Sequence, residues 1–317
     1  NIAGGAFAGI LLGFAVAFLL HQMDRRIREV ADVEALGVPI LGVFPRAGQS
    51  SADAPSGFSG RRKGQKVAEV ENIDRIVHSQ PMSMAAELCR TIRTNLVFMA
   101  AESPSKTMVV TSANPEDGKT TVATNIAISL AQSGQRVLLI DADLRRPRIH
   151  RTFDLENRAG LTITLVGERS LSQGTLDVGI EKLSVVTCGP LPPNPAELLH
   201  TRQFAQVLEE AESRYDRVIL DSPPLRAVTD AAIIAPQCGG ALLVVRAEAT
   251  TRDAVVGALQ SLRNVGAHVL GGVLNDVEPH RSGQGHPGGG YYGYYRNEPW
   301  DDGGDSDDDS GHSQSAA

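Results

Sequence analysis

The sequence of 317 residues predicts an α/β fold in which helices cover both faces of a mostly parallel sheet. Short runs rich in Val, Ile and Leu recur along the chain, helical stretches separate most of them, and a phosphate-binding pattern joins the first run to a helix. The predicted strands are Thr107 to Thr111, Val137 to Ile140, Leu183 to Thr187, Val218 to Leu220, Ala241 to Val245 and Val269 to Leu274.

The acidic charge of the chain is concentrated near its C-terminal end. The net charge of −7 results from 30 basic and 37 acidic residues, and seven of the acids are Glu298 and the six Asp from Asp301 to Asp309. The preceding part is therefore neutral overall, and no nucleic-acid partner is expected, because such binding requires a concentrated basic face. The three widely spaced cysteines favour buried thiols in a reducing compartment over a disulfide framework or a zinc site.

The N-terminal residues predict a membrane anchor. Ile2 to Leu20 are nineteen residues without a charge, and at about 1.5 Å per helical residue they span roughly the 30 Å hydrocarbon core. Three arginines follow this run, which places its C-terminal side in the cytoplasm and argues against a cleaved signal peptide. We therefore expect a transmembrane helix at residues 1–20, with a buried soluble helix as the alternative. Because the chain begins at Asn1 and not at Met, further sequence is expected before it.

Three regions follow this expected helix. Residues 21–66 form a juxtamembrane segment and linker, with a short helix, the extended VPILGVFPR and a Ser/Gly/Pro-rich stretch. Residues 67–278 hold the α/β domain, which begins with a helix from about Met84 to Met99. Residues 279–317 contain almost no aliphatic side chains, which predicts a disordered tail.

The pattern AxxxxGKT from Ala113 to Thr120 predicts a P-loop that binds ATP and Mg²⁺. Such a loop directs backbone N–H groups at the phosphates, its Lys119 reaches the outer phosphates, and the Thr120 hydroxyl binds magnesium. Ala113 replaces the usual first Gly, but the strand TMVVTS and the helix TTVATNIAISLAQ flank the loop as required. The predicted nucleotide-binding residues here are Ala113, Asn114, Pro115, Glu116, Asp117, Gly118, Lys119, Thr120 and Thr121.

Two carboxylate motifs end later strands, at the edge where open α/β sheets bind ligands. Asp141 and Asp143 of LLIDADLRRP lie on the same side of an extended segment, so both can face the phosphates. Asp221 of VILDSPP ends its strand in the position of a Walker B acid. An Asp at a strand end is often only a cap or turn residue. In combination with the P-loop, these acids predict a magnesium site formed by Thr120, Asp143 and Asp221.

These motifs resemble those of the bacterial tyrosine kinases, or BY-kinases, the cytoplasmic halves of polysaccharide co-polymerases. In that family the loop is Walker A, DAD with Arg145 is Walker A′, and Asp221 is Walker B. The resemblance covers nearly the whole chain, including the segments VPILGVFPR and GPLPPNPAELLHTRQF. It implies catalysis by Lys119, Asp141 and Asp143, with either aspartate as the base, and an Arg145 that contacts phosphate or braces the acidic pair.

The segment ELCRTIR carries the spacing ExxRxxR through Glu87, Arg90 and Arg93. Residues three apart share a helix face, so they predict a charged stripe, for which a solvated surface is the alternative interpretation. The resemblance implies a homo-oligomeric ring held by this helix, with the catalytic domain on the cytoplasmic side of a bacterial inner membrane. It also implies as partners a chain-length co-polymerase region, the polymerisation and export machinery, and a cognate tyrosine phosphatase.

The tail holds four of the five tyrosines of the chain in the motif YYGYY, namely Tyr291, Tyr292, Tyr294 and Tyr295. Packing does not explain tyrosines in a disordered tail, whereas a tether brings their hydroxyls to a neighbouring site at high effective concentration. We therefore expect ATP-dependent autophosphorylation in trans, and the resemblance to the BY-kinases implies that it regulates capsule or exopolysaccharide polymerisation and export.

Two alternatives to a kinase belong to other functional classes. One is an ATPase switch that regulates polysaccharide assembly or the positioning of partners without phosphorylating them. The other is a membrane-tethered partition ATPase, but Asn114 stands where those ATPases carry an extra Lys. The tyrosine cluster favours a kinase over both.

Overall fold

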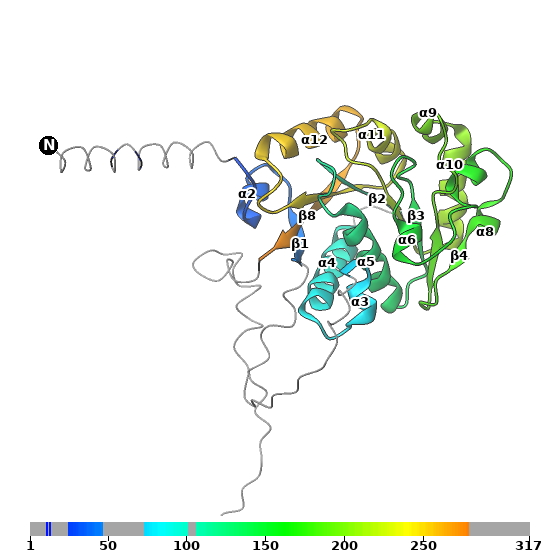
Figure 1. Ribbon diagram of the computed structural model, residues 1–317, viewed down its shortest axis with the longest axis horizontal. Coiled ribbons are helices and arrows are strands. Elements are labelled where there is room, and N and C mark those ends of the chain that lie inside the picture. The colour runs from blue at the N-terminus through cyan, green and yellow to red at the C-terminus, as the bar shows by residue number, and fades with distance from the viewer. Residues whose placement is uncertain (1–10, 12, 14–24, 47–72, 101–105, 279–317) are drawn as a thin grey trace, which may run out of the picture. The chain divides into compact units, whose positions relative to one another are not determined.

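The computed structural model describes residues 11, 13, 25–46, 73–100 and 106–278, and these residues confirm the predicted α/β fold (Figure 1). They form an eight-stranded sheet in the order β1-β8-β7-β2-β6-β3-β5-β4, parallel except for the β4–β5 pair. The strands are β1 (Ile40–Pro45), β2 (Thr107–Ser112), β3 (Val137–Asp141), β4 (Leu176–Asp177), β5 (Leu183–Val186), β6 (Arg217–Asp221), β7 (Ala241–Arg246) and β8 (Val269–Val277).

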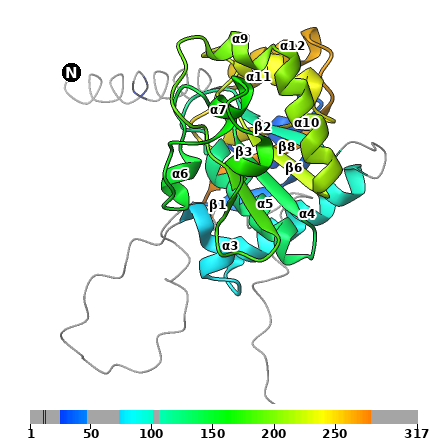
Figure 2. The same cartoon turned by 90° about the vertical axis from the view of Figure 1, so that its right-hand side faces the viewer.

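Helices cover both faces of this sheet. Figures 1 and 2 place α3, α4 and α5 on one face and α10, α11 and α12 on the other. The longer helices are α4 (Met84–Ala100), α5 (Lys119–Gln132), α10 (Arg202–Arg214) and α12 (Arg252–Asn264). The short ones are α2 (Val30–Glu34), η1 (Ile73–Arg75), α3 (Ile76–Ser79), α6 (Ile149–Thr152), α7 (Leu161–Leu165), α8 (Leu171–Gly174), α9 (Pro195–Leu199), α11 (Asp230–Ile234) and η2 (Ala235–Gln237).

The core lies between the central strands and these helices. Val137 to Ile140 of β3 are all 0% exposed, as expected for a parallel strand covered on both faces. The helix α5, which follows the P-loop, is buried over most of its length. The start of α5 and the ends of β2, β6 and β3 are therefore held on a rigid frame.

Strand β1 extends the sheet with residues that the sequence analysis assigned to a juxtamembrane segment outside the α/β domain. It pairs in parallel with β8, for example Val43 with Leu274. It also packs closely on α4, since a Cβ added to Gly42 would lie 2.5 Å from Ile92 Cγ1. The folded body thus begins before the predicted boundary at Val67. Pairing of β1 with a strand more than two hundred residues later leaves no signal in the local pattern.

Several predictions fall on other parts of the chain. The expected membrane helix apart from residues 11 and 13, the linker after Arg46 and the whole tail lie outside the described residues. Among the described helices, none has both the length and the hydrophobicity that a membrane span requires.

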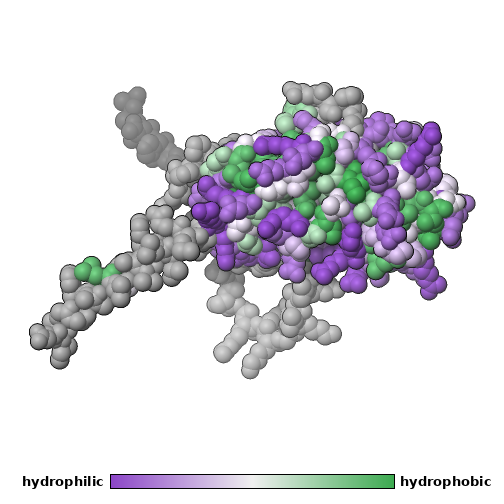
Figure 3. All heavy atoms as spheres, turned by 90° about the horizontal axis from the view of Figure 1, so that it is seen from above, coloured by the Kyte–Doolittle hydropathy of each residue, from purple (hydrophilic) through white to green (hydrophobic). Residues whose placement is uncertain are grey.

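The surface is mainly a mixture of polar and small apolar areas (Figure 3). Large exposed apolar side chains occur at both ends of α4, where Met82 and Met84 precede or begin the helix and Val97 and Phe98 lie near its end. Phe98 is 71% exposed. Exposed apolar side chains at this density are typical of helices that contact another surface.

Candidate active site

The P-loop connects β2 to α5, as predicted. Gly118 precedes α5 with φ of +91°, and a Cβ at this position would lie 1.9 Å from Asn275 Nδ2 on β8. The same Nδ2 donates a hydrogen bond of 2.9 Å to the Asp117 carbonyl oxygen. Only glycine combines this backbone conformation with so close a neighbour. Sequence reasoning found Gly118 but not Asn275, which lies outside the motif.

A buried carboxylate holds the P-loop together from within. Asp117 is 2% exposed, and its two oxygens accept hydrogen bonds of 2.8 Å from the Asn114 amide and of 2.8 Å from Thr250 Oγ1. Burial raises the pKa of Asp117, and these two hydrogen bonds partly oppose that effect. Thr250 was not predicted, because it follows β7 and carries no motif.

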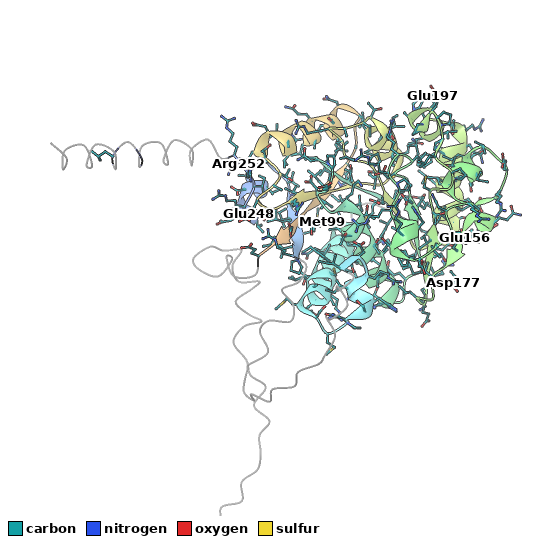
Figure 4. The ribbon with its side chains drawn as sticks, viewed as in Figure 1. Met99, Glu156, Asp177, Glu197, Glu248 and Arg252 are labelled. Atoms are coloured by element: carbon teal, nitrogen blue, oxygen red, sulfur yellow. The ribbon has the colours of Figure 1, made fainter. Side chains whose placement is uncertain are left out.

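The loop that carries Thr250 also contacts the segment before α2. The Ile27 amide donates to the Thr250 carbonyl at 2.8 Å, and Arg252 forms an ion pair with Asp32 of α2. Figure 4 labels Glu248 of this loop and Arg252, the first residue of α12, close to α2. The P-loop is therefore linked through Thr250 to residues that follow the expected membrane helix.

The predicted lysine, threonine and aspartates meet at the ends of three adjacent strands. Lys119 Nζ lies 3.2 Å from Asp143 Oδ2, and Thr120 Oγ1 donates a hydrogen bond of 2.6 Å to Asp221 Oδ2. Asp141 and Asp221 are paired neighbours on β3 and β6. The charges of Asp221 and Asp143 raise the pKa of Lys119 in opposition to burial, which alone lowers it.

Asp141 and Asp221 each have one oxygen that no described residue contacts through a hydrogen bond. Asp141 Oδ2 accepts from the amides of Arg148 at 3.1 Å and Ile149 at 3.0 Å. The Oδ1 atoms of Asp141 and Asp221 are buried and have no hydrogen-bond donor within the described part of the chain. Burial raises the pKa of Asp141 well above its usual range, and the nearby charge of Asp221 adds to this. Burial likewise raises the pKa of Asp221 to about 6, although Lys119 opposes the shift.

The Asp221 Oδ1 atom, the Thr120 hydroxyl and the Asp143 carboxylate beside Lys119 fit a magnesium ion. Mg²⁺ prefers oxygen ligands and is commonly bound by one or two carboxylates together with water and substrate phosphates. Among the described residues, no three acidic, His or Cys side chains form a metal site by themselves. A cation here would also relieve the cost of two buried carboxylates.

Arg145 has a partner that the sequence did not predict. Its guanidinium makes two hydrogen bonds, of 2.8 and 2.9 Å, to the fully buried Asp230 at the start of α11. The backbone amides of Arg145 and Arg146 both donate to Asp143 Oδ1, at 3.3 and 2.9 Å. Asp230 therefore fixes the turn that orients Asp143. The contact of Arg145 with phosphate remains a prediction.

Two further residues that contact the P-loop helix or belong to it were not predicted from the sequence. Asp74 of η1 accepts from Thr121 Oγ1 and forms an ion pair of 2.6 Å with Arg148. Asn125 Oδ1 accepts from the Val77 amide at 3.1 Å. Together these contacts fasten the segment before α4 to α5, where no sequence pattern suggested a functional role.

The ExxRxxR residues make ion pairs or hydrogen bonds within the same chain, which a fully solvent-exposed charged stripe would not do. Arg90 pairs with Glu87 at 2.5 Å, and Arg93 donates to the Ser129 carbonyl of α5 at 3.1 Å. All three side chains remain half-exposed. The predicted acceptors at residues 291–295 lie outside the described residues. Tyr215, the remaining tyrosine, is buried at the end of α10.

The fold and this site are those of a P-loop nucleotide-binding protein. Comparison with known proteins shows which group of P-loop proteins it resembles. The family model described as "AAA domain" matches residues 105–265. The tyrosine-protein kinase YwqD of Bacillus subtilis is 40% identical over 220 residues, which cover 69% of this chain and 90% of YwqD. The tyrosine-protein kinase etk of Escherichia coli is 32% identical over 277 residues, which cover 87% of this chain but 38% of etk.

Solved structures agree with these relatives. The kinase domain of the Escherichia coli tyrosine kinase ETK is 33% identical and superimposes with a TM-score of 0.69, covering 80% of this chain and 96% of that domain. The chimerical protein CapA2B2 is 35% identical with a TM-score of 0.68, covering 79% of this chain and all of the chimera. The chain belongs to the bacterial tyrosine kinase family, the BY-kinases.

Proposed function

We propose that this chain is an ATP-dependent protein tyrosine kinase that phosphorylates the cluster Tyr291, Tyr292, Tyr294 and Tyr295 of a neighbouring copy. The observation that carries the proposal is the convergence of Lys119 with three strand-end carboxylates at one sheet edge. The tyrosine kinase relatives support phosphoryl transfer over simple ATP hydrolysis.

In the proposed reaction, the P-loop amides and Lys119 hold the β- and γ-phosphates of ATP. Thr120, Asp221 and Asp143 would hold Mg²⁺, which neutralises charge on the phosphates when bound. Lys119 stays protonated, since neighbouring carboxylates raise its pKa, and it stabilises the charge that develops on the transferred group. Arg145, with two of its donors fixed by Asp230, has its others available for phosphate.

Either Asp141 or Asp143 orients and deprotonates the acceptor hydroxyl. The ion pair of Asp143 with Lys119 suits a residue that positions the phosphates and metal. The unpartnered Oδ1 of Asp141 suits a proton acceptor, and a carboxylate with a raised pKa takes up a proton more readily. We therefore assign the base to Asp141.

The wider role that we propose is regulation of capsule or exopolysaccharide polymerisation and export at a bacterial inner membrane. Residues 1–20 would anchor the chain, and the co-polymerase region, the export machinery and a tyrosine phosphatase would act with it. Signals from the membrane would reach Asp117 through the segment around Ile27 and Thr250, which are hydrogen-bonded to each other.

We also propose that α4 holds copies in a ring. Its half-exposed Glu87, Arg90 and Arg93 and its exposed Phe98 support this role. Phosphorylation of the tail adds negative charge and would loosen the ring by repulsion. Equal assembly of unmodified and fully phosphorylated chains in sedimentation measurements would refute this last step.

The test is phosphotyrosine mapping by mass spectrometry after incubation with ATP and Mg²⁺, beside a Lys119→Met control. We expect modification within residues 291–295 of the parent chain and none in the control. An assembled, ATP-binding sample without modified tail tyrosines would instead favour the ATPase switch. Modification of Tyr215 alone would also count against the kinase proposal, because that side chain is buried.

A further inference from the structure

An uninterrupted basic stretch borders the active site. Between Asp143 and Asp154 the chain carries four arginines and a histidine and no acidic residue. Two of these arginines are neutralised, Arg145 by Asp230 and Arg148 by Asp74. The other two are Arg146 and Arg151.

Arg146 and Arg151 are exposed, and neither guanidinium has a carboxylate partner among the described residues. Arg226 is also exposed, lies beside the P-loop, and donates to the neutral Asn114 Oδ1 at 3.1 Å. We call these three residues the basic rim. Because the chain before Glu298 is neutral overall, this excess of positive charge is local.

The basic rim lies next to the reacting groups. The amide of Arg146 is 2.9 Å from Asp143 Oδ1. Arg151 follows, by two residues, Ile149, whose amide is 3.0 Å from Asp141 Oδ2. The backbone of Arg146 thus touches one candidate base, and Arg151 comes two residues after the amide that touches the other. The rim residues therefore border the site on the segment that follows Asp143 and beside the P-loop.

The sequence that follows the tyrosine cluster has the complementary charge. Glu298 to Asp309 contain seven acids and no Lys or Arg. Glu298 comes three residues after Tyr295, which is about 10 Å in an extended chain at roughly 3.3–3.6 Å per residue. With Tyr295 at the base, Glu298 can therefore reach the residues that border the site, and the six Asp follow it along the chain.

We propose that the basic rim binds the acidic segment at residues 298–309 of a second copy and thereby docks that copy's tyrosines in the site. This docking rests on the proposed kinase function and assigns a recognition element to it. Exposed charge pairs are individually weak and sensitive to salt, so the rim acts on capture of the acceptor and not on the chemical step.

The test is a trans assay with full chains in detergent. The substrate is the Lys119→Met chain, with either the native tail or a tail in which Glu298→Gln and the six Asp→Asn remove the acids. The enzyme carries Phe at the four tail tyrosines and the same neutralised tail, so that it neither accepts phosphate there nor competes for the rim. Phosphate transfer gives KM and kcat for each substrate at low and at high salt.

We expect the KM for the substrate with the native acidic tail to be about tenfold lower than the KM for the substrate with the neutralised tail. The two kcat values should differ by less than twofold. Several weak pairs acting together give a factor of this size. At about 0.5 M salt the difference should largely disappear, since the Debye length falls to a few ångströms. An Arg146→Gln/Arg151→Gln enzyme should lose the preference while its KM for the neutralised tail is unchanged. Arg263→Gln, an exposed arginine at the end of α12, is the matched control.

Equal KM values for the two tails would overturn the docking proposal and leave the kinase assignment intact. If the rim variant raised KM or lowered kcat equally for both substrates, the docking proposal would also be overturned. The arginines would then contribute to ATP binding or to folding and not to recognition of the acidic tail. Absence of phosphotyrosine on either substrate would reject the kinase assignment itself, and docking with it.

Discussion

Replacement of Asp221 by Asn should stabilise the nucleotide-free protein at neutral pH. The carboxylate of Asp221 is fully buried beside Asp141, and one of its oxygens has no donor among the described residues. Asn keeps an oxygen that accepts the bond from Thr120 Oγ1 but carries no charge. The substitution therefore removes the cost of a buried anion while the surrounding packing is retained.

The size of the effect follows from the pKa of Asp221. Burial raises that pKa from 3.8 to about 6, which corresponds to about 3 kcal/mol at about 1.4 kcal/mol per pH unit. Since the folded state binds the proton more tightly than the unfolded state, ionisation costs stability as pH rises from about 4 to about 6. Below pH 4 both states are protonated and this cost is absent. The free energy of unfolding of the parent chain should thus fall across this pH range. The Asp221→Asn variant should not show the share of this fall that comes from ionisation of Asp221.

Urea unfolding of both proteins from pH 4 to pH 8, without nucleotide or divalent metal, measures this difference. We expect the variant to gain about 2–3 kcal/mol over the parent at pH 8 and almost nothing at pH 4. Because the other titrating groups are shared, the difference between the two curves reports Asp221 together with its effect on the neighbouring Asp141 and Lys119. Mg²⁺ with ATP should reverse the order by stabilising the parent selectively. A variant that is less stable than the parent at pH 8, or a difference that does not vary with pH, would refute the reasoning.

Three further substitutions test the contacts around the site. Gly118→Ala should weaken ATP binding at least tenfold by fluorescence titration, since its Cβ meets Asn275 Nδ2 and its φ is positive. Thr250→Val should cost about 1–3 kcal/mol in urea unfolding, because it removes a donor from a buried carboxylate, whereas Thr250→Ser should restore most of this. Asp230→Asn should lower kcat with little change in the KM for ATP, because it frees the turn that orients Asp143; equal loss in both constants would contradict this role.

The parts of the structure with local patterns were predictable. The strand from Val137 and the helix from Met84 begin at the predicted residues, because apolar runs and helical periodicity depend on neighbours in the sequence. The meeting of Lys119, Asp143 and Asp221 at one edge of the sheet was predictable because a P-loop and acidic strand ends have fixed relations in this fold class, and their roles stay predictions.

The supporting contacts were not predictable, for a physical reason. Asp230 holds Arg145 across 85 residues, and Asn275 supports the P-loop across 158. Neither residue differs in its local pattern from an ordinary helix start or strand end. Contacts of this kind depend on the order of the strands, which a single sequence does not supply.

The position of β1 has a consequence for the order in which the domain forms. Among the described strands its partner is β8, which is made last, so a growing chain presents an unpaired β1 throughout synthesis of the remaining strands. Closure of that edge comes just before the tail with its tyrosines is made. Chains truncated before Val269 should therefore be cleaved readily by protease near β1. The tyrosine cluster would then be synthesised only after β8, the strand that pairs with β1 and completes the sheet of the proposed kinase domain.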